Sequence, residues 1–124
     1  MDKSVILVAD DSDIIGNIIK TALSNNFDVI VTKNGQECVN QLIANKDRKI
    51  AGLFLDLMMP QFDGFTVLEF FITNNLFDVI PVCIISGDDT KETIDRAFTY
   101  KIKDMINKPF GIQDVVQMAQ KMVI

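Results

Sequence analysis

Five short apolar runs recur along this chain, each followed by a longer segment with the spacing of an amphipathic helix. Three of these runs are almost uninterrupted in hydrophobicity, which is typical of parallel strands covered on both faces. Strands that alternate with helices favour a three-layer α/β sandwich, (βα)5, around a parallel five-stranded sheet. The expected strands are Val5–Ala9, Val29–Thr32, Ile50–Leu55, Ile80–Ile85 and Met105–Asn107.

Each segment between the expected strands carries a helix-capping residue or an apolar stripe at helical spacing. The first has the widest stripe, formed by Ile14, Ile15, Ile18, Ile19, Ala22 and Leu23. Right-handed crossovers place every loop that leads from a strand into a helix at one edge of the sheet. Ligands bind at that edge in sheets of this kind. The expected helix starts are Ser12 or Asp13, Gln36, Asp63, Asp89 or Thr90, and Ile112.

The length of 124 residues predicts a single domain over residues 1–124. No apolar stretch approaches the roughly 18–20 residues that cross a bilayer, and the N-terminal run is too short for a signal peptide. We therefore expect a cytoplasmic protein with no membrane partner. A net charge of −5 argues against nucleic-acid binding. The absence of histidine excludes Ser-His and Cys-His triads, and the two distant cysteines, Cys38 and Cys83, argue against a zinc site.

Polar residues follow the apolar runs at the edge where this fold builds its sites. They are Asp10 and Asp11 after the first run, Asp56 after the third, Ser86 after the fourth and Lys108 after the fifth. Three converging carboxylates repel one another, so they need a cation or abnormal protonation. Oxygen ligands suit a hard divalent ion, and Mg²⁺ is the expected one. Asp56 could then act as a nucleophile that forms an acyl phosphate, with Lys108 and Ser86 donating to phosphoryl oxygens.

Each of these residues also has an ordinary structural interpretation when it is taken alone. Asp10 or Asp11 could cap a helix, Lys108 could be a solvated lysine, and Ser86 could be a turn residue. The convergence of matching chemistry at four strand ends is what favours a site over these alternatives.

The motifs "ILVADD", "LDLMMPQFDG", "IISG" and "INKPF", in this order and spacing, resemble the response-regulator receiver domain of two-component signalling. The resemblance covers essentially the whole chain. It implies a flavodoxin-like sheet of strand order 2-1-3-4-5 and a cis peptide bond before Pro109. It also implies that Asp56 is the phospho-acceptor and that Ser86 and Lys108 contact the phosphoryl oxygens.

The same resemblance implies a Mg²⁺ cofactor and its ligands. Asp10 and Asp11 are the acidic pair, with Asp11 the more direct ligand. Asp56 and the backbone carbonyl of Met58 complete the set that the protein would supply.

The resemblance further implies a signalling module, with no enzyme activity beyond its own phosphorylation and dephosphorylation. A sensor histidine kinase or a phosphotransfer protein would donate the phosphoryl group. The face built by the fourth helix, fifth strand and fifth helix would then bind a downstream protein, and the chain would be a monomer or a phosphorylation-dependent dimer. A free-standing receiver in chemotaxis or a phosphorelay is the expected context. A receiver excised from a hybrid kinase or a longer regulator is the alternative.

An alternative from another class is a haloacid-dehalogenase-like phosphohydrolase, which also uses an aspartate nucleophile and Mg²⁺ at strand ends. Asp11 and Asp13 superficially fit its first motif. That interpretation leaves Asp56 unexplained, and the chain has no room for the usual cap domain. A flavodoxin is disfavoured because an acidic first loop would repel the flavin phosphate.

The chain departs from the family pattern at positions that tune and report phosphorylation. Met105 stands where the family usually has Tyr or Phe, so we expect a weaker or differently read switch. Met58 and Asp88 lie two residues after Asp56 and Ser86, where side chains flank the phosphoryl group and tune its hydrolysis in this family.

Two further segments have unusual sequences. Lys101 and Ile102 replace the Gly-Ala that commonly ends the fourth helix, which predicts a strained residue near Tyr100–Lys101 or a reshaped loop. In the third helix, Phe70 and Ile72 lie off the core-facing stripe, which predicts either partial burial under neighbouring loops or a partner-binding patch.

Overall fold

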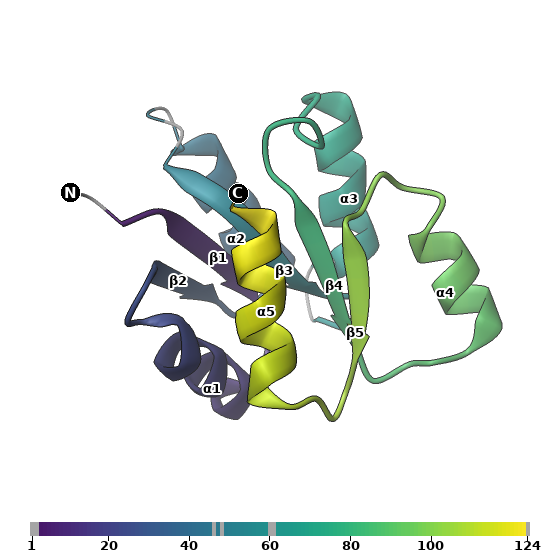
Figure 1. Ribbon diagram of the computed structural model, residues 1–124. Coiled ribbons are helices and arrows are strands. Elements are labelled where there is room, and N and C mark those ends of the chain that lie inside the picture. Colours follow the sequence, from purple (N-terminus) through teal and green to yellow (C-terminus); the bar gives the residue numbers. More distant parts are fainter. Residues whose placement is uncertain (1–2, 46, 48, 60–61, 124) are drawn as a thin grey trace.

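Five parallel strands form one sheet in the order β2-β1-β3-β4-β5, with helices on both faces (Figure 1). The structure, a computed structural model, describes residues 3–45, 47, 49–59 and 62–123. The strands are β1 (Val5–Ala9), β2 (Asp28–Thr32), β3 (Ile50–Asp56), β4 (Val82–Ser86) and β5 (Asp104–Asn107). The helices are α1 (Asp13–Leu23), α2 (Gly35–Ile43), α3 (Gly64–Thr73), α4 (Lys91–Ala97) and α5 (Ile112–Met122). None of the helices in the described ranges has both the length and the apolar character needed to cross a membrane. The expected flavodoxin-like (βα)5 fold and its strand order are confirmed.

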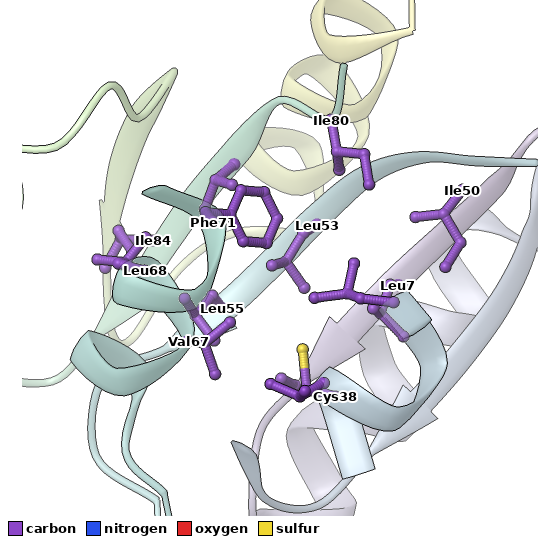
Figure 2. Close-up of a cluster of buried hydrophobic side chains, with 14 of the residues drawn as sticks. Leu7, Cys38, Ile50, Leu53, Leu55, Val67, Leu68, Phe71, Ile80 and Ile84 are labelled. Atoms are coloured by element: carbon purple, nitrogen blue, oxygen red, sulfur yellow. The ribbon is translucent and has the colours of Figure 1, made fainter. Parts of the chain in front are cut away.

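The sheet separates two hydrophobic cores, because successive residues of a strand point to opposite faces. On one face, Leu7 and Leu53 pack with α2 and α3, where Cys38 and Phe71 are buried (Figure 2). On the other face, residues such as Phe54 pack with α1 and α5. The central strands are therefore held rigidly from both sides, and so are the residues at their ends.

Side-chain caps set the starts of α1, α3 and α4. The caps are Ser12, which accepts a hydrogen bond from the Ile15 N–H, Asp63, which accepts from Thr66, and Thr90, which accepts from Thr93. The alternative caps Asp13 and Asp89 are therefore excluded. The cap at Ser12 also excludes the interpretation of Asp10 or Asp11 as the cap of α1.

The expected start of the fourth strand at Ile80 is wrong. β4 begins at Val82, because the Ile80 N–H already donates to the Leu76 carbonyl at 2.8 Å. Pro81 follows and has no N–H to donate to a neighbouring strand. Ile80 is nevertheless buried and contributes to the core on the α2–α3 side (Figure 2).

The strained residue expected near Tyr100–Lys101 is also wrong, since neither of these described residues has a positive φ. The chain leaves α4 early instead, at Ala97. The N–H groups of Thr99 and Tyr100 then close tight turns on the carbonyls of Arg96 and Ala97, at 3.2 Å each. These turns correspond to the other expectation for this segment, a reshaped loop after the helix.

The apolar faces of α1 and α3 are only partly covered. In α1, Ile19 is fully buried, whereas Ile14 is 71% and Ile18 is 38% exposed. In α3, Phe70 is half-buried against the core on its side of the sheet, while Ile72 is 53% exposed. The partial burial expected for Phe70 is confirmed, and the periodicity of α1 overstated how much of that helix faces the core.

Gly64→Ala is expected to destabilise the protein by about 1–3 kcal/mol, the usual cost of overpacking. A Cβ at this position would lie 2.5 Å from the Asp56 carbonyl oxygen and 2.7 Å from the Leu57 Cα, so α3 would be pushed away from the end of β3. Urea denaturation measures the change in the free energy of unfolding.

Gly87→Ala is the matched control for this prediction. A Cβ there meets no atom within 4 Å, so the change in stability should stay within about 0.5 kcal/mol. Equal effects of the two substitutions would contradict the close packing of α3 on β3.

Candidate functional site

The strand register brings the polar residues of four loops to one edge of the sheet. Ala9 pairs with Leu55 across β1 and β3. Asp10 and Asp56 are the next residues after this pair, so they lie side by side at the ends of adjacent strands. Asp56 in turn pairs with Ile85 of β4. Lys108 directly follows β5, whose last residue pairs with Ser86. The predicted convergence of these residues is therefore a direct result of the topology.

Three carboxylates meet at this edge. Asp10, Asp11 and Asp56 each offer an oxygen, and these oxygens lie within 4.8 Å of one another. Asp10 and Asp56 are 0% and 2% exposed, whereas Asp11 is open to solvent. The cluster is buried on one side and accessible on the other, which lets a dissolved ion reach it.

Lys108 is a cation that the two buried carboxylates share. Its Nζ lies 2.8 Å from Asp10 Oδ2 and 3.3 Å from Asp56 Oδ2. Burial acts to lower the pKa of Lys108, but the contacts with Asp10 and Asp56 outweigh it and the pKa is raised. The lysine is therefore charged at neutral pH and is not a solvated side chain. The peptide bond that follows it, Lys108–Pro109, is cis, as expected.

Asp56 lies in an environment that disfavours its charge. Burial raises the pKa of its carboxyl, and so does repulsion from Asp10. The Met58 N–H, which donates to Asp56 Oδ1 at 3.1 Å, and Lys108 both act to lower this pKa, but the net shift is upward. The Asp56 carboxylate is thus costly to keep ionised without an additional cation.

The residues present fit a hard divalent cation. Asp10 Oδ1 accepts a hydrogen bond from the Ser12 N–H at 2.9 Å, and the buried Asp10 Oδ2 lies 2.8 Å from the Nζ of Lys108, a cation that it shares with Asp56. An ion at the carboxylate cluster would add positive charge where Lys108 alone pairs with two of the three carboxylates. All the donors are oxygens, which suits Mg²⁺, and the solvent-exposed Asp11 leaves space for the waters that Mg²⁺ retains. The main chain of Met58, the remaining predicted ligand, is held next to Asp56 by its N–H bond.

Ser86 is buried at the end of β4, and its hydroxyl is already engaged. It donates to the Asp88 carbonyl at 3.2 Å and accepts from the Asp88 N–H at 3.0 Å. The Asp88 carboxylate binds the start of α4, where Oδ1 accepts from the Thr90 N–H at 2.9 Å and Oδ2 from the Thr93 hydroxyl at 2.8 Å. These hydrogen bonds lower the pKa of Asp88. The predicted tuning residue is therefore engaged by α4 in this conformation.

Met105 lies on β5, half-buried against the core on the α2–α3 side of the sheet. Its main-chain N–H is bound by the Asp104 carboxylate at 2.8 Å. The position predicted to act as the switch is thus at the boundary between the core and the surface. It is occupied there by a flexible thioether in place of a ring.

The sequence reasoning missed a contact between α3 and α4. The Arg96 guanidinium lies 3.7 Å from the centre of the Phe65 ring. The Tyr100 hydroxyl hydrogen-bonds the Glu69 carboxylate, and the Tyr100 ring lies near those of Phe65 and Phe77. Nothing in the local periodicity links these residues, because they belong to segments about thirty positions apart in the chain.

Comparisons with known proteins agree with this geometry. A family model described as the response regulator receiver domain matches residues 6–120. Chemotaxis protein CheY1 of Helicobacter pylori strain J99 is 33% identical over 110 residues, which cover 87% of each chain. Response regulator RR06 of Streptococcus pneumoniae serotype 2 is 34% identical over 119 residues, which cover 95% of this chain and 52% of the relative. The chain thus spans about half the length of that relative.

Solved structures share the fold over almost the whole chain. The receiver domain of Francisella response regulator 1452 is 28% identical and has a TM-score of 0.86, with coverage of 98% of this chain and 97% of the other. Chemotaxis protein CheY4 of Vibrio cholerae has a TM-score of 0.85 at 17% identity, with coverage of 98% and 99%. At 17% identity, the likeness to CheY4 shows a shared fold and nothing further.

In the metal-free protein, Asp56→Asn is expected to raise the free energy of unfolding at neutral pH, because it removes a buried charge. The raised pKa of the Asp56 carboxyl determines whether this difference in the free energy of unfolding grows or shrinks with pH. The stabilising contribution of the Asp56 carboxyl is complete below its ordinary pKa of 3.8 and is lost as the pH rises through the folded-state value. The advantage of the variant over the wild type should therefore be small in acid and grow toward neutral pH. Urea denaturation at a series of pH values, with a chelator present, measures it.

Asp89→Asn is the control for this titration, because Asp89 is an exposed carboxylate outside the cluster. Its stability should follow the wild type at every pH. If the wild type instead gained stability over Asp56→Asn between acid and neutral pH, the sign derived for Asp56 would be wrong.

Proposed function

The chain belongs to the response regulator receiver domain family, and from this premise we propose that it accepts a phosphoryl group on Asp56. The observation that carries the proposal is the position of Lys108, whose Nζ lies 3.3 Å from Asp56 Oδ2 and 2.8 Å from Asp10 Oδ2. A compact cation at this point would contact the oxygens of a phosphoryl group on Asp56. The same contact favours Asp56 over the exposed Asp11 as the nucleophile, which argues against the phosphohydrolase alternative.

The proposed donor is a phosphohistidine on a sensor histidine kinase or a phosphotransfer protein. A carboxylate oxygen of Asp56 bonds to phosphorus while the bond between phosphorus and the histidine nitrogen breaks, and that nitrogen keeps the electron pair. The attacking form is the ionised carboxylate. Lys108 and the Met58 N–H both favour that form, against the effects of burial and Asp10.

We propose Mg²⁺ as the cofactor, held by Asp10, Asp11, Asp56 and the Met58 carbonyl. When bound, the ion would offset the negative charge of the carboxylates and of the phosphoryl oxygens. The three clustered carboxylates, of which Lys108 pairs with two, and the all-oxygen donor set support this choice.

The proposed output is a change in partner binding on the face formed by α4, β5 and α5, in a chemotaxis or phosphorelay pathway of the cytoplasm. The likeness to a chemotaxis protein of Helicobacter pylori supports this context. In this proposal residues 1–124 form one receiver domain, which acts as a signalling module. Met105 replaces the aromatic switch, so part of the response would be reported through other residues.

Incubation with phosphoramidate and Mg²⁺ is expected to add one phosphoryl group to the wild type and none to Asp56→Asn. Lys108→Ala should slow the reaction by about 10²-fold, the usual effect of removing one donor to a developing oxyanion. Intact-mass spectrometry over time measures both effects. Lys33→Ala removes an exposed lysine that pairs with Asp13 at the surface, and it should react at the wild-type rate. Phosphorylation of Asp56→Asn to the wild-type extent would refute the assignment.

Mg²⁺ alone is expected to raise the thermal midpoint of the wild type, because it binds only the folded carboxylate cluster. At a concentration about 100 times its Kd, the gain is about 2.7 kcal/mol. Asp11→Asn should lose most of this gain and Asp89→Asn should keep it, as measured by thermal unfolding with and without the ion. Equal stabilisation of both variants would place the metal elsewhere.

A further inference from the structure

Helix α4 is attached to the rest of the protein mainly at its two ends. It has seven residues, and among them only Ala97 is buried. Figure 1 shows α4 standing out from the edge of the sheet beyond β5, whereas α1, α2, α3 and α5 lie against its faces. Its orientation therefore depends on a few polar and aromatic contacts rather than on a packed face.

The N-terminal attachment is a set of hydrogen bonds that we call the α4 tether, formed by Asp88, Thr90 and Thr93. The Asp88 carboxylate accepts from the Thr90 N–H at 2.9 Å and from the Thr93 hydroxyl at 2.8 Å. Thr90 in turn caps the helix by accepting from the Thr93 N–H at 3.3 Å. One side chain thus satisfies donors on both the cap and the first turn of α4.

The C-terminal attachment is independent of the tether. Arg96 lies over the Phe65 ring, and the Tyr100 hydroxyl binds Glu69, so this end is fixed to α3. If the tether were released while these contacts remained, the N-terminal half of α4 would be the part free to move or fray.

Ser86 connects the tether to the candidate phosphorylation site. Its hydroxyl has a single proton, which it donates to the Asp88 carbonyl, and it also accepts from the Asp88 N–H. Donation of that proton to a phosphoryl oxygen on Asp56 requires the bond to the Asp88 carbonyl to break. The Asp88 main chain then loses one of its two hydrogen bonds to the Ser86 hydroxyl at the end of β4.

We propose that Asp88 is a positioning residue that couples the hydroxyl of Ser86 to the first turn of α4. The inference rests on the proposed function of Asp56. In the unphosphorylated protein, Ser86 holds the Asp88 main chain and Asp88 holds α4. When Ser86 turns to a phosphoryl group, the α4 tether loosens and the first turn of α4 opens. This route to the output face uses no movement of Met105.

Hydrogen exchange of the α4 backbone amides tests the coupling in the full chain. In the unphosphorylated wild type the Ile94 N–H, which donates to the Thr90 carbonyl, should be protected. Phosphorylation with phosphoramidate and Mg²⁺ should speed exchange at residues 93–95 by about three- to tenfold, since a lost cap opens the helix end by this order. Asp88→Ala should show the faster exchange already without phosphorylation, and phosphorylation should then add less than about twofold.

Thr93→Val provides a second variant that leaves Asp88 in place. It removes the hydroxyl that donates to Asp88 Oδ2 and accepts from the Thr90 hydroxyl, and it keeps the β-branched shape. It should shift exchange in the same direction as Asp88→Ala, by a smaller factor. Thr21→Val, an exposed threonine of α1, is the matched control and should keep the wild-type response.

The decisive quantity is the ratio of exchange rates with and without the phosphoryl group. A purely structural role of Asp88 would speed exchange equally in both states and leave this ratio at its wild-type value, which would overturn the proposal. A full phosphoryl mass increase with unchanged α4 exchange in the wild type would overturn the coupling while the function of Asp56 stands. A missing mass increase in the wild type would overturn the proposed function and the coupling with it.

Discussion

The site depends on one electrostatic constraint: two carboxylates are buried side by side at the edge of the sheet, and one lysine lies within 3.3 Å of both. Burial of charges costs several kcal/mol per ion unless a partner compensates it. Lys108 compensates part of that cost, yet the pKa of Asp56 remains raised. The unliganded site is therefore left short of positive charge. That deficit is a physical reason to expect a divalent cation here.

The rest of the fold keeps this unfavourable arrangement in place. Asp10 and Asp56 extend from strands that are packed on both faces, so neither can retreat into solvent without disturbing the cores. Gly64 lets α3 approach the last residue of β3 closely, which fixes the loop beyond Asp56. Functional sites commonly lower the stability of the fold that carries them. Here the apolar packing of the buried strands offsets the free-energy cost of the buried carboxylates.

Most of the fold and the centre of the site could be predicted because strong local signals agreed with one another. The uninterrupted apolar runs placed the central strands, and parallel topology then brought Asp56 and Lys108 together although 52 positions separate them. The sequence was less informative where the outcome depends on contacts between distant segments. The pairing of Tyr100 with Glu69 and of Arg96 with Phe65 has no local pattern. The hydrogen bonds of the Asp88 carboxylate to the Thr90 N–H and the Thr93 hydroxyl were not predicted either, because the sequence does not show which way this side chain turns.

The peripheral placement of α4 has an energetic consequence for signalling. Because this helix contributes little buried apolar surface, its rearrangement leaves both hydrophobic cores intact. The free energy needed to alter it is that of a few hydrogen bonds, roughly 0.5–1.5 kcal/mol each, which is within the range that a single covalent modification can supply. The same small domain can therefore combine a rigid carboxylate cluster with an easily moved helix, because the cluster is held by the packed strands and α4 by a few polar and aromatic contacts.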